Sequence, residues 1–275
     1  MILNEKQLAA SKKIYMAWDL PSLDKAIPVL KDTQGLLKNV KINSLYVKEG
    51  DKAITELNKY GMNVFLDLKF YDIPGTVENH CYAATKQGVK FLTVHAHGGV
   101  DMMKAALKGA TKASEEFGIE RPKILGITVL TSFTLDSYLE TLGCVYHFPC
   151  NDLSKMEESY KDFKSKYIMT NVIDQVVCLA GLAKKAGIDG VVCSPKEVGA
   201  IKKIYPSLIT MVPGIKGPLS GVAGDTQNMD RVDTPGNAIK SGADYLVIGS
   251  AIYKDKEKTP NQAMIDIIND ISEVL

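Results

Sequence analysis

Residues 63–72 read Asn63-Val-Phe-Leu-Asp-Leu-Lys-Phe-Tyr-Asp72, a short apolar run that ends in charged residues. A brief apolar run of this kind is typical of a strand buried in a parallel sheet. Because side chains alternate along a strand, Asp67 and Lys69 lie on one face and Leu68 lies on the other. We therefore expect a strand over 63–68 that delivers Asp67 and Lys69 together to its carboxyl end.

Seven further runs of the same kind recur along the chain, at 13–18, 40–46, 91–95, 123–130, 190–193, 209–212 and 245–248. Helix-like stretches separate them, and apolar residues recur at helical spacing over 100–116 and, after the last run, over 262–274. Parallel strands that alternate with crossover helices give this pattern, and eight such units make a closed barrel. The sequence therefore predicts an α/β protein with a (β/α)8 TIM-barrel fold.

One unit is longer than the others, because residues 131–188 exceed one loop and one helix. Met156, Tyr160 and Phe163 recur there at helical spacing, so we expect an extra helical excursion at about 135–170, outside a single barrel domain that spans 1–275. A second irregular stretch, 214–230, is rich in glycine and is typical of a lid after the seventh strand.

The composition narrows the possible partners. The chain has 33 basic and 32 acidic residues in 275, a net charge of +1, which argues against nucleic acid or an anionic membrane as partner. No apolar stretch approaches the roughly 20 residues of a membrane span, and the first residues lack the layout of a signal peptide. The five cysteines form no CxxC pair, so we expect free thiols in a cytoplasmic protein.

Charged residues occupy the strand ends, where TIM barrels carry their catalytic groups. Asp19 follows the first run, Lys41 lies in the second, and Asp67, Lys69 and Asp72 come from the third. Opposite charges within about 4 to 6 Å favour the ionised forms, so we expect Lys69 to remain an ammonium. An ammonium is a poor Schiff-base nucleophile but a good proton donor to a carbanion. The alternative reading of the same residues is an ion-pair network that only fills the barrel.

The segment Asp67-Leu-Lys-Phe-Tyr-Asp-Ile-Pro-Gly-Thr-Val77 closely resembles the signature of the orotidine 5'-phosphate decarboxylase family, DxKxxDI followed by Pro and Thr. Related sugar-phosphate enzymes share the shorter DxKxxD pattern. The flanking segments are also similar to the decarboxylase family, including 18–24, 40–42, 126–132, 187–194, 212–215, 224–227, 234–235 and 242–249. The resemblance covers residues 13 to about 253 apart from the excursion.

The resemblance implies cofactor-free decarboxylation of orotidine 5'-phosphate to uridine 5'-phosphate in pyrimidine biosynthesis. By position, Asp19 and Lys41 would hold ribose hydroxyls, Asp67 would face the substrate carboxylate, and Lys69 would give a proton to C6. Thr131 would read the pyrimidine edge. Losing carbon dioxide leaves a carbanion that is poorly delocalised, so fixed charge in a dry site would have to stabilise it.

Assembly is also implied by the resemblance. Active sites in this family are shared across a homodimer, so Asp72, Ile73 and Thr76 would serve the neighbouring subunit's site. The partners expected are therefore a small nucleotide substrate and a second copy of the chain, without any metal.

The phosphate end departs from the family pattern. By resemblance, Pro213 and Gln227 belong to the phosphate loop, with Gln227 bridging base and phosphate. The family usually has arginine where this chain has Ser250, and many members have arginine at Lys216. Lysine lacks the bidentate fork of arginine, so we expect phosphate recognition with a shifted cation, Lys216, and the amides of Gly249 and Ser250.

Two other functions compete with the decarboxylase. One is a magnesium-dependent aldolase of the same barrel superfamily, which would use the carboxylates as metal ligands; the second cation, Lys41, argues against it. The other is a relative with altered phosphate recognition, motivated by Ser250. His95 and His97 lie on one face but lack a third ligand, so we expect a polar role at the barrel mouth instead of a metal site.

Overall fold

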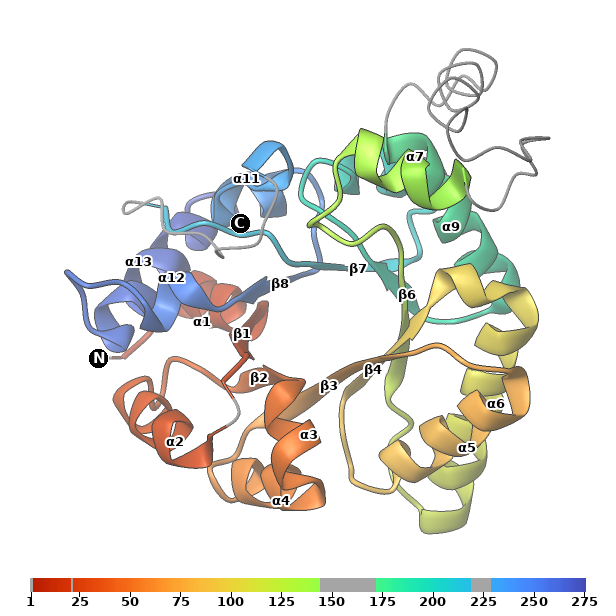
Figure 1. Cartoon of the computed structure of the whole chain (residues 1–275). Helices are drawn as coiled ribbons and strands as arrows, with labels where there is room; N and C mark the ends of the chain where they lie inside the picture. The colour runs from red at the N-terminus through yellow and green to blue at the C-terminus, as the bar shows by residue number, and fades with distance from the viewer. Residues whose placement is uncertain (1, 21, 144–171, 219–228) are drawn as a thin grey trace, which may run out of the picture.

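The computed structural model describes residues 2–20, 22–143, 172–218 and 229–275. Eight parallel strands close into a barrel in chain order, and β8 pairs with β1 (Figure 1). The strands are β1 Ile14–Trp18, β2 Asn39–Ile42, β3 Asn63–Phe70, β4 Phe91–His95, β5 Lys123–Ile127, β6 Gly190–Val192, β7 Ile209–Val212 and β8 Tyr245–Ile248. The predicted (β/α)8 barrel is confirmed.

Helices surround the strands on the outside of the barrel (Figure 1). They are α1 Glu5–Lys12, α2 Leu23–Asp32, α3 Ser44–Glu49, α4 Asp51–Lys59, α5 Pro74–Thr85, α6 Gly99–Phe117, α7 Leu135–Gly143, α9 Val172–Ala186, α10 Val198–Ile204, α11 Pro235–Lys240, α12 Ser250–Tyr253 and α13 Pro260–Ser272. The helices predicted over 100–116 and 262–274 correspond to α6 and α13. None of the helices in the described ranges has the length and apolar character that a membrane crossing needs.

The alternation of side chains along the strands builds two separate cores. Ile14, Met16 and Trp18 of β1 face outward and belong to the large core between the strands and the helices. Tyr15 and Ala17 face inward and belong to a smaller core inside the barrel. Both faces of each strand are therefore buried, as the apolar runs of the sequence require.

Aromatic rings fill part of the barrel interior. The Tyr15 ring lies edge-on to Phe65, Phe91 and Tyr245, with centroid separations of 6.0, 5.4 and 5.8 Å. Edge-to-face packing at these distances is favourable for aromatic rings. Since Phe65 belongs to this layer and Asp67 lies two residues further along the same face of β3, polar groups begin just beyond the aromatic rings.

Two strand ends differ most from the sequence prediction. The second run was expected to extend through 46, but β2 ends at Ile42 and α3 begins at Ser44, with Leu45 fully buried. A short apolar run does not distinguish a buried strand from the first turn of a buried helix. The fifth run was expected to reach 130, but β5 ends at Ile127.

The long unit after β5 begins with α7, which lies within the predicted excursion of 135–170. The remaining part of that prediction, including Met156, Tyr160 and Phe163, lies outside the described residues. Most of the lid predicted over 214–230 also lies outside the described residues, because the description stops at 218 and resumes at 229. Among the described cysteines, Cys81, Cys178 and Cys193 are free thiols, as expected.

Candidate active site

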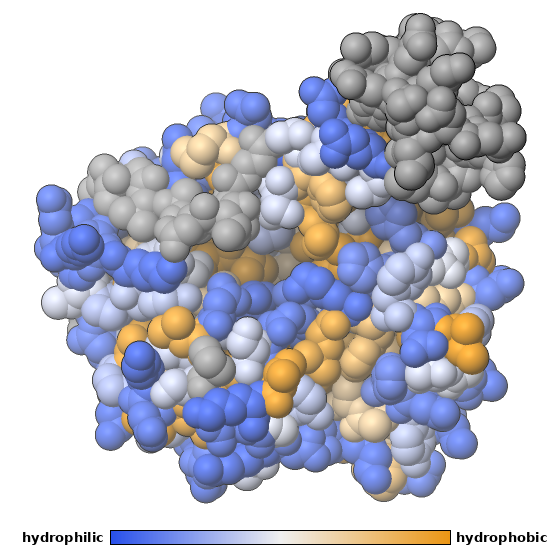
Figure 2. All heavy atoms as spheres, in the orientation of Figure 1, coloured by the Kyte–Doolittle hydropathy of each residue, from blue (hydrophilic) through white to orange (hydrophobic). Residues whose placement is uncertain are grey.

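A cavity of about 520 Å³ opens at the carboxyl ends of the strands. In Figure 2 this face is hollowed near its centre, with hydrophobic residues on one side of the hollow and hydrophilic residues on the other. The lining includes eight of the residues singled out from the sequence: Asp19, Lys41, Asp67, Lys69, Thr131, Pro213, Gly249 and Ser250. Most of the expected site is therefore assembled around one cavity.

The end of β3 brings Asp67 and Lys69 together, as the alternation predicted. The Lys69 ammonium Nζ lies 2.7 Å from Oδ2 of Asp67. The register between β3 and β4 shifts between Leu66 and Phe70, and Lys69 has a φ of 52°, in the left-handed region that non-glycine residues rarely adopt. Such strained conformations persist when the surroundings fix them and cluster at functional sites.

Lys41 of β2 joins this pair from the neighbouring strand. Its Nζ lies 2.8 Å from Oδ1 of Asp19 and 3.4 Å from Oδ2 of Asp67. Burial opposes the charge on Lys41, but the attraction of Asp67 and Asp19 outweighs it, so the pKa of Lys41 is raised above its usual value. Lys41 is thus held as a cation between two carboxylates.

Burial differs sharply within this charged array. The side chain of Asp67 is 9% exposed and that of Lys41 is 10% exposed, whereas Lys69 is 30% exposed. Asp67 is therefore fixed in the wall between two ammonium groups, and Lys69 presents its ammonium to the cavity. The array has no net charge, because its two lysines are balanced by its two aspartates, Asp19 and Asp67. A bound substrate would therefore contact fixed positive and negative groups at separate positions.

Thr93 of β4 completes the support of Asp67, and the sequence reasoning missed it. Its hydroxyl donates to Oδ1 of Asp67 at 2.9 Å and accepts the backbone N–H of Lys69 at 2.9 Å. Thr93 is fully buried. A signal was present in the sequence, because Thr93 lies between Phe91 and His95 on the interior face of β4, where an apolar residue would otherwise be expected.

Arg231 anchors the opposite wall and was also missed. Its guanidinium donates to the carbonyl oxygens of Val129 and Leu130, next to Thr131, and forms a buried ion pair with Glu197. Glu197 in turn accepts the backbone N–H of Ser194 through its other carboxylate oxygen, at 2.7 Å. Arg231 therefore ties the segment that follows the glycine-rich stretch to the loop that carries Thr131.

Four of the expected site residues are described but do not line this cavity, and a fifth lies outside the described residues. Asp72 and Ile73 are exposed at the start of α5, where Oδ1 of Asp72 accepts the backbone N–H of Ile73 at 2.7 Å, and Thr76 is half-buried in the first turn. Lys216 is half-buried, and its backbone N–H donates to the carbonyl of Asp233 at 3.0 Å. Gln227 lies outside the described residues.

His95 and His97 lie beside the charged array. Burial lowers the pKa of His95, and the positive charge of the neighbouring His97 and Lys69 lowers it further. Burial also lowers the pKa of His97. A ring nitrogen of His97, Nε2, lies 2.7 Å from the hydroxyl of Tyr138, and the His95 ring packs on Tyr71 at 5.4 Å between centroids. Within the described ranges, no three His, Cys, Asp or Glu side chains gather as metal ligands would.

Comparisons with known proteins find similar sequences and a similar fold. The family model named "Orotidine 5'-phosphate decarboxylase / HUMPS family" matches residues 12–150 and 151–264. Two relatives named orotidine 5'-phosphate decarboxylase come from Dichelobacter nodosus, 38% identical over 91% of this chain and 95% of its own length, and Pelobacter propionicus, 35% identical over 95% and 96%. The crystal structure of orotidine 5'-phosphate decarboxylase from Lactobacillus acidophilus superposes with a TM-score of 0.70 at 28% identity, covering 94% of this chain and 98% of that one.

Proposed function

The chain belongs to the orotidine 5'-phosphate decarboxylase / HUMPS family, and we propose from this premise that it converts orotidine 5'-phosphate to uridine 5'-phosphate in pyrimidine biosynthesis. The observation that carries the proposal is the Lys69 ammonium, held 2.7 Å from buried Asp67 in the wall of the barrel cavity. The relatives named above carry the decarboxylase name, so the aldolase alternative is not favoured.

The proposed reaction needs only one proton besides the substrate, and Lys69 supplies it. The bond between C6 and the carboxylate carbon breaks, carbon dioxide leaves, and the electron pair stays on C6. Lys69 Nζ then gives a proton to C6, and the resulting neutral amine regains a proton from water. No electrons are gained or lost overall.

Fixed charge supplies the stabilisation in this account. The negative charge at C6 develops next to the Lys69 ammonium. Asp67 accepts a hydrogen bond from this ammonium, and the Thr93 hydroxyl accepts the backbone N–H of Lys69, so both hold Lys69 in place before the reaction. Groups oriented in advance toward developing charge contribute several kcal/mol in sites that exclude water. The Asp67 carboxylate, between Lys41 and Lys69, would face the substrate carboxylate and disfavour the bound ground state relative to the product of carbon dioxide loss.

The remaining substrate contacts are proposed from their positions around the cavity. Asp19 and Lys41 would hold ribose hydroxyls, and Thr131 would contact the pyrimidine edge. Pro213, Gly249 and Ser250 line the end at which the phosphate would lie. Lys216 and Gln227 would reach it from the segment after β7.

We also propose a cytoplasmic, single-domain protein that assembles as a homodimer with shared active sites. Asp72 and Ile73 are exposed and do not line the cavity of their own chain, which is the placement expected of residues that complete a partner's site. Mixing Lys69→Ala with Asp72→Ala subunits should then restore activity in the heterodimer. Subunits that exchange and stay inactive would refute the shared site.

An absorbance assay tests the function. Purified protein should lower the ultraviolet absorbance of orotidine 5'-phosphate as the conjugated carboxylate is lost, and the rate should be unchanged in excess chelator. Loss of the activity in chelator, with recovery on adding magnesium, would instead favour the aldolase class. No absorbance change with the intact protein would refute the decarboxylase.

A further inference from the structure

The backbone of β3 leaves the regular sheet pattern where it delivers its charged residues. Lys69 has a φ of 52°, and the pairing between β3 and β4 shifts register between Leu66 and Phe70. On the other side, β2 pairs with β3 only as far as Ile42 and Leu66. The regular ladder with β2 therefore ends before Asp67, and the backbone groups that follow need other hydrogen-bond partners.

Asn43, directly after β2, provides one of these partners. Its side-chain amide Nδ2 donates a hydrogen bond of 2.7 Å to the backbone carbonyl oxygen of Asp67. The hydroxyl of Thr93 on β4 accepts the backbone N–H of Lys69 at 2.9 Å. The two peptide groups that flank Leu68 are thus each bonded to a side chain, one from each neighbour of β3.

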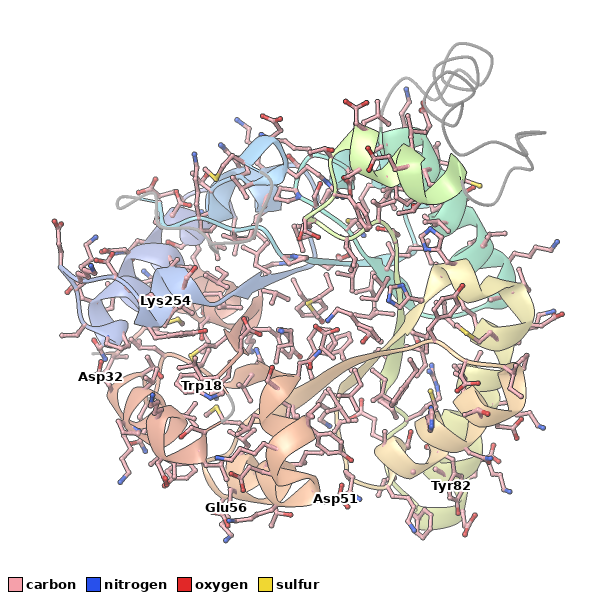
Figure 3. The ribbon with its side chains drawn as sticks, in the orientation of Figure 1. Trp18, Asp32, Asp51, Glu56, Tyr82 and Lys254 are labelled. Atoms are coloured by element: carbon pink, nitrogen blue, oxygen red, sulfur yellow. The ribbon has the colours of Figure 1, made fainter. Side chains whose placement is uncertain are left out.

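Asn43 makes this bond in place of the one that asparagine usually makes at such a position. It is the residue before α3, which begins at Ser44 beside β3 (Figure 3). Asparagine is preferred there because its side-chain oxygen can accept a backbone N–H of the first helical turn. The Asn43 side chain makes no such bond. Local preferences of this kind are most often set aside at functional sites.

We propose that Asn43 is a positioning residue for the decarboxylation, which fixes the peptide group between Asp67 and Leu68. The inference rests on the proposed function, because it assigns a role toward that reaction. Asn43 does not line the cavity, so it acts through its neighbours. The Nζ of Lys69 lies 2.7 Å from Oδ2 of Asp67 and 3.5 Å from the carbonyl oxygen that Asn43 holds. Fixing this peptide group therefore fixes both oxygen atoms that surround the ammonium.

Two substitutions separate this role from a purely structural one. Serine and aspartate are both preferred before a helix, but the serine side chain is one atom shorter than asparagine, and a carboxylate accepts hydrogen bonds without donating them. Asn43→Ser and Asn43→Asp should each lower kcat for orotidine 5'-phosphate about 10- to 100-fold, the cost of displacing a catalytic group by up to about 1 Å, with a much smaller change in KM. Wild-type kcat in both variants overturns the inference.

Asn39→Ser is the matched control, because Asn39 lies at the opposite end of the same strand. Its amide Nδ2 donates to the carbonyl oxygens of Lys12 and Ile14, at 3.2 and 3.1 Å. Asn39 is buried and does not line the cavity, so losing these bonds should destabilise the fold without moving the charged array. Under conditions where urea unfolding shows every variant to be folded, Asn39→Ser should keep the wild-type kcat. An equal loss of kcat in Asn39→Ser and Asn43→Ser also overturns the inference.

The chemical reactivity of Lys69 keeps this inference separable from the proposed function. Acetylation by a small acylating reagent, followed by mass spectrometry, measures how fast each lysine reacts. Asn43→Ser should raise the rate at Lys69, which is 30% exposed and paired with Asp67, but not at Lys52, an exposed lysine of α4. If the wild-type protein does not decarboxylate, the proposed function fails while this comparison still decides the role of Asn43. An unchanged rate at Lys69 overturns the inference.

Discussion

Replacing Thr93 with valine should damage both the stability and the catalysis of this protein, because one hydroxyl supports two parts of the charged array. It donates to Oδ1 of Asp67 and accepts the backbone N–H of Lys69, each at 2.9 Å. Thr93→Val preserves the shape of the side chain and removes both bonds. We regard Thr93 as a positioning residue, since it acts through Asp67 and Lys69.

The size of the effect follows from those two bonds. Losing a hydrogen bond to a charged group costs about 1.5 to 3 kcal/mol, and leaving a buried N–H without a partner costs about 1 to 3 kcal/mol. We therefore expect Thr93→Val to lower the free energy of unfolding by about 3 kcal/mol or more. The left-handed backbone at Lys69, with φ of 52°, loses the acceptor of its N–H. Because small displacements of a catalytic group cost up to about 100-fold, kcat should fall by about 10- to 100-fold with a smaller change in KM.

Urea unfolding and steady-state kinetics measure the two effects, and Thr93→Ser is the control because it retains the hydroxyl. Thr93→Ser should keep most of kcat while losing some packing. The reasoning would be refuted by a Thr93→Val protein with the wild-type unfolding midpoint and kcat. It would also be refuted if Thr93→Ser lost as much kcat as Thr93→Val.

Two further predictions concern the buried and partly buried arginines. Arg231→Met should lower the free energy of unfolding by about 3 to 5 kcal/mol, because Glu197 is 1% exposed and would keep an uncompensated charge. Adding Glu197→Gln should recover part of that loss in urea unfolding, and a double variant no more stable than the single one would contradict this. At Asp189, burial favours the neutral carboxyl, but hydrogen bonds from Arg121 and the Ile124 backbone lower its pKa below the usual 3.8. A lowered carboxyl pKa stabilises the fold above about pH 4 and loses that contribution as the pH falls further, so the Tm difference between wild type and Arg121→Met should be largest near neutral pH and shrink below pH 4. A Tm difference that is constant from pH 7 to pH 3 would contradict the assignment.

The order of the elements could be predicted from the sequence because each strand is buried on both faces. The runs at 91–95, 209–212 and 245–248 coincide with β4, β7 and β8. The alternation on β3 also predicted that Asp67 and Lys69 share a face, which their ion pair confirms. The end of β2 was missed, because Leu45 is buried in a helix and an apolar residue gives no sign of which element buries it.

The sequence analysis missed Arg231, Lys254 and Thr93, residues of the cavity wall or its support, for separate reasons. Arg231 contacts Leu130, which is 101 positions away in the chain, and no local pattern encodes such a contact. Lys254 also lines the cavity, directly after the single-turn helix α12, in a segment where charged residues are frequent. Thr93 alone carried a local signal, as a polar residue that follows Phe91 on the interior face of β4.

The most direct test of the account is single-turnover decarboxylation by the wild-type protein and by Lys69→Ala. Carbon dioxide and uridine 5'-phosphate should form in equal amounts with the wild-type protein. Lys69→Ala should be slower by roughly 1,000-fold or more, because it loses both the proton donor and the fixed charge next to C6. Lys69→Ala that turns over at the wild-type rate, or a wild-type protein that releases no carbon dioxide, would contradict the account.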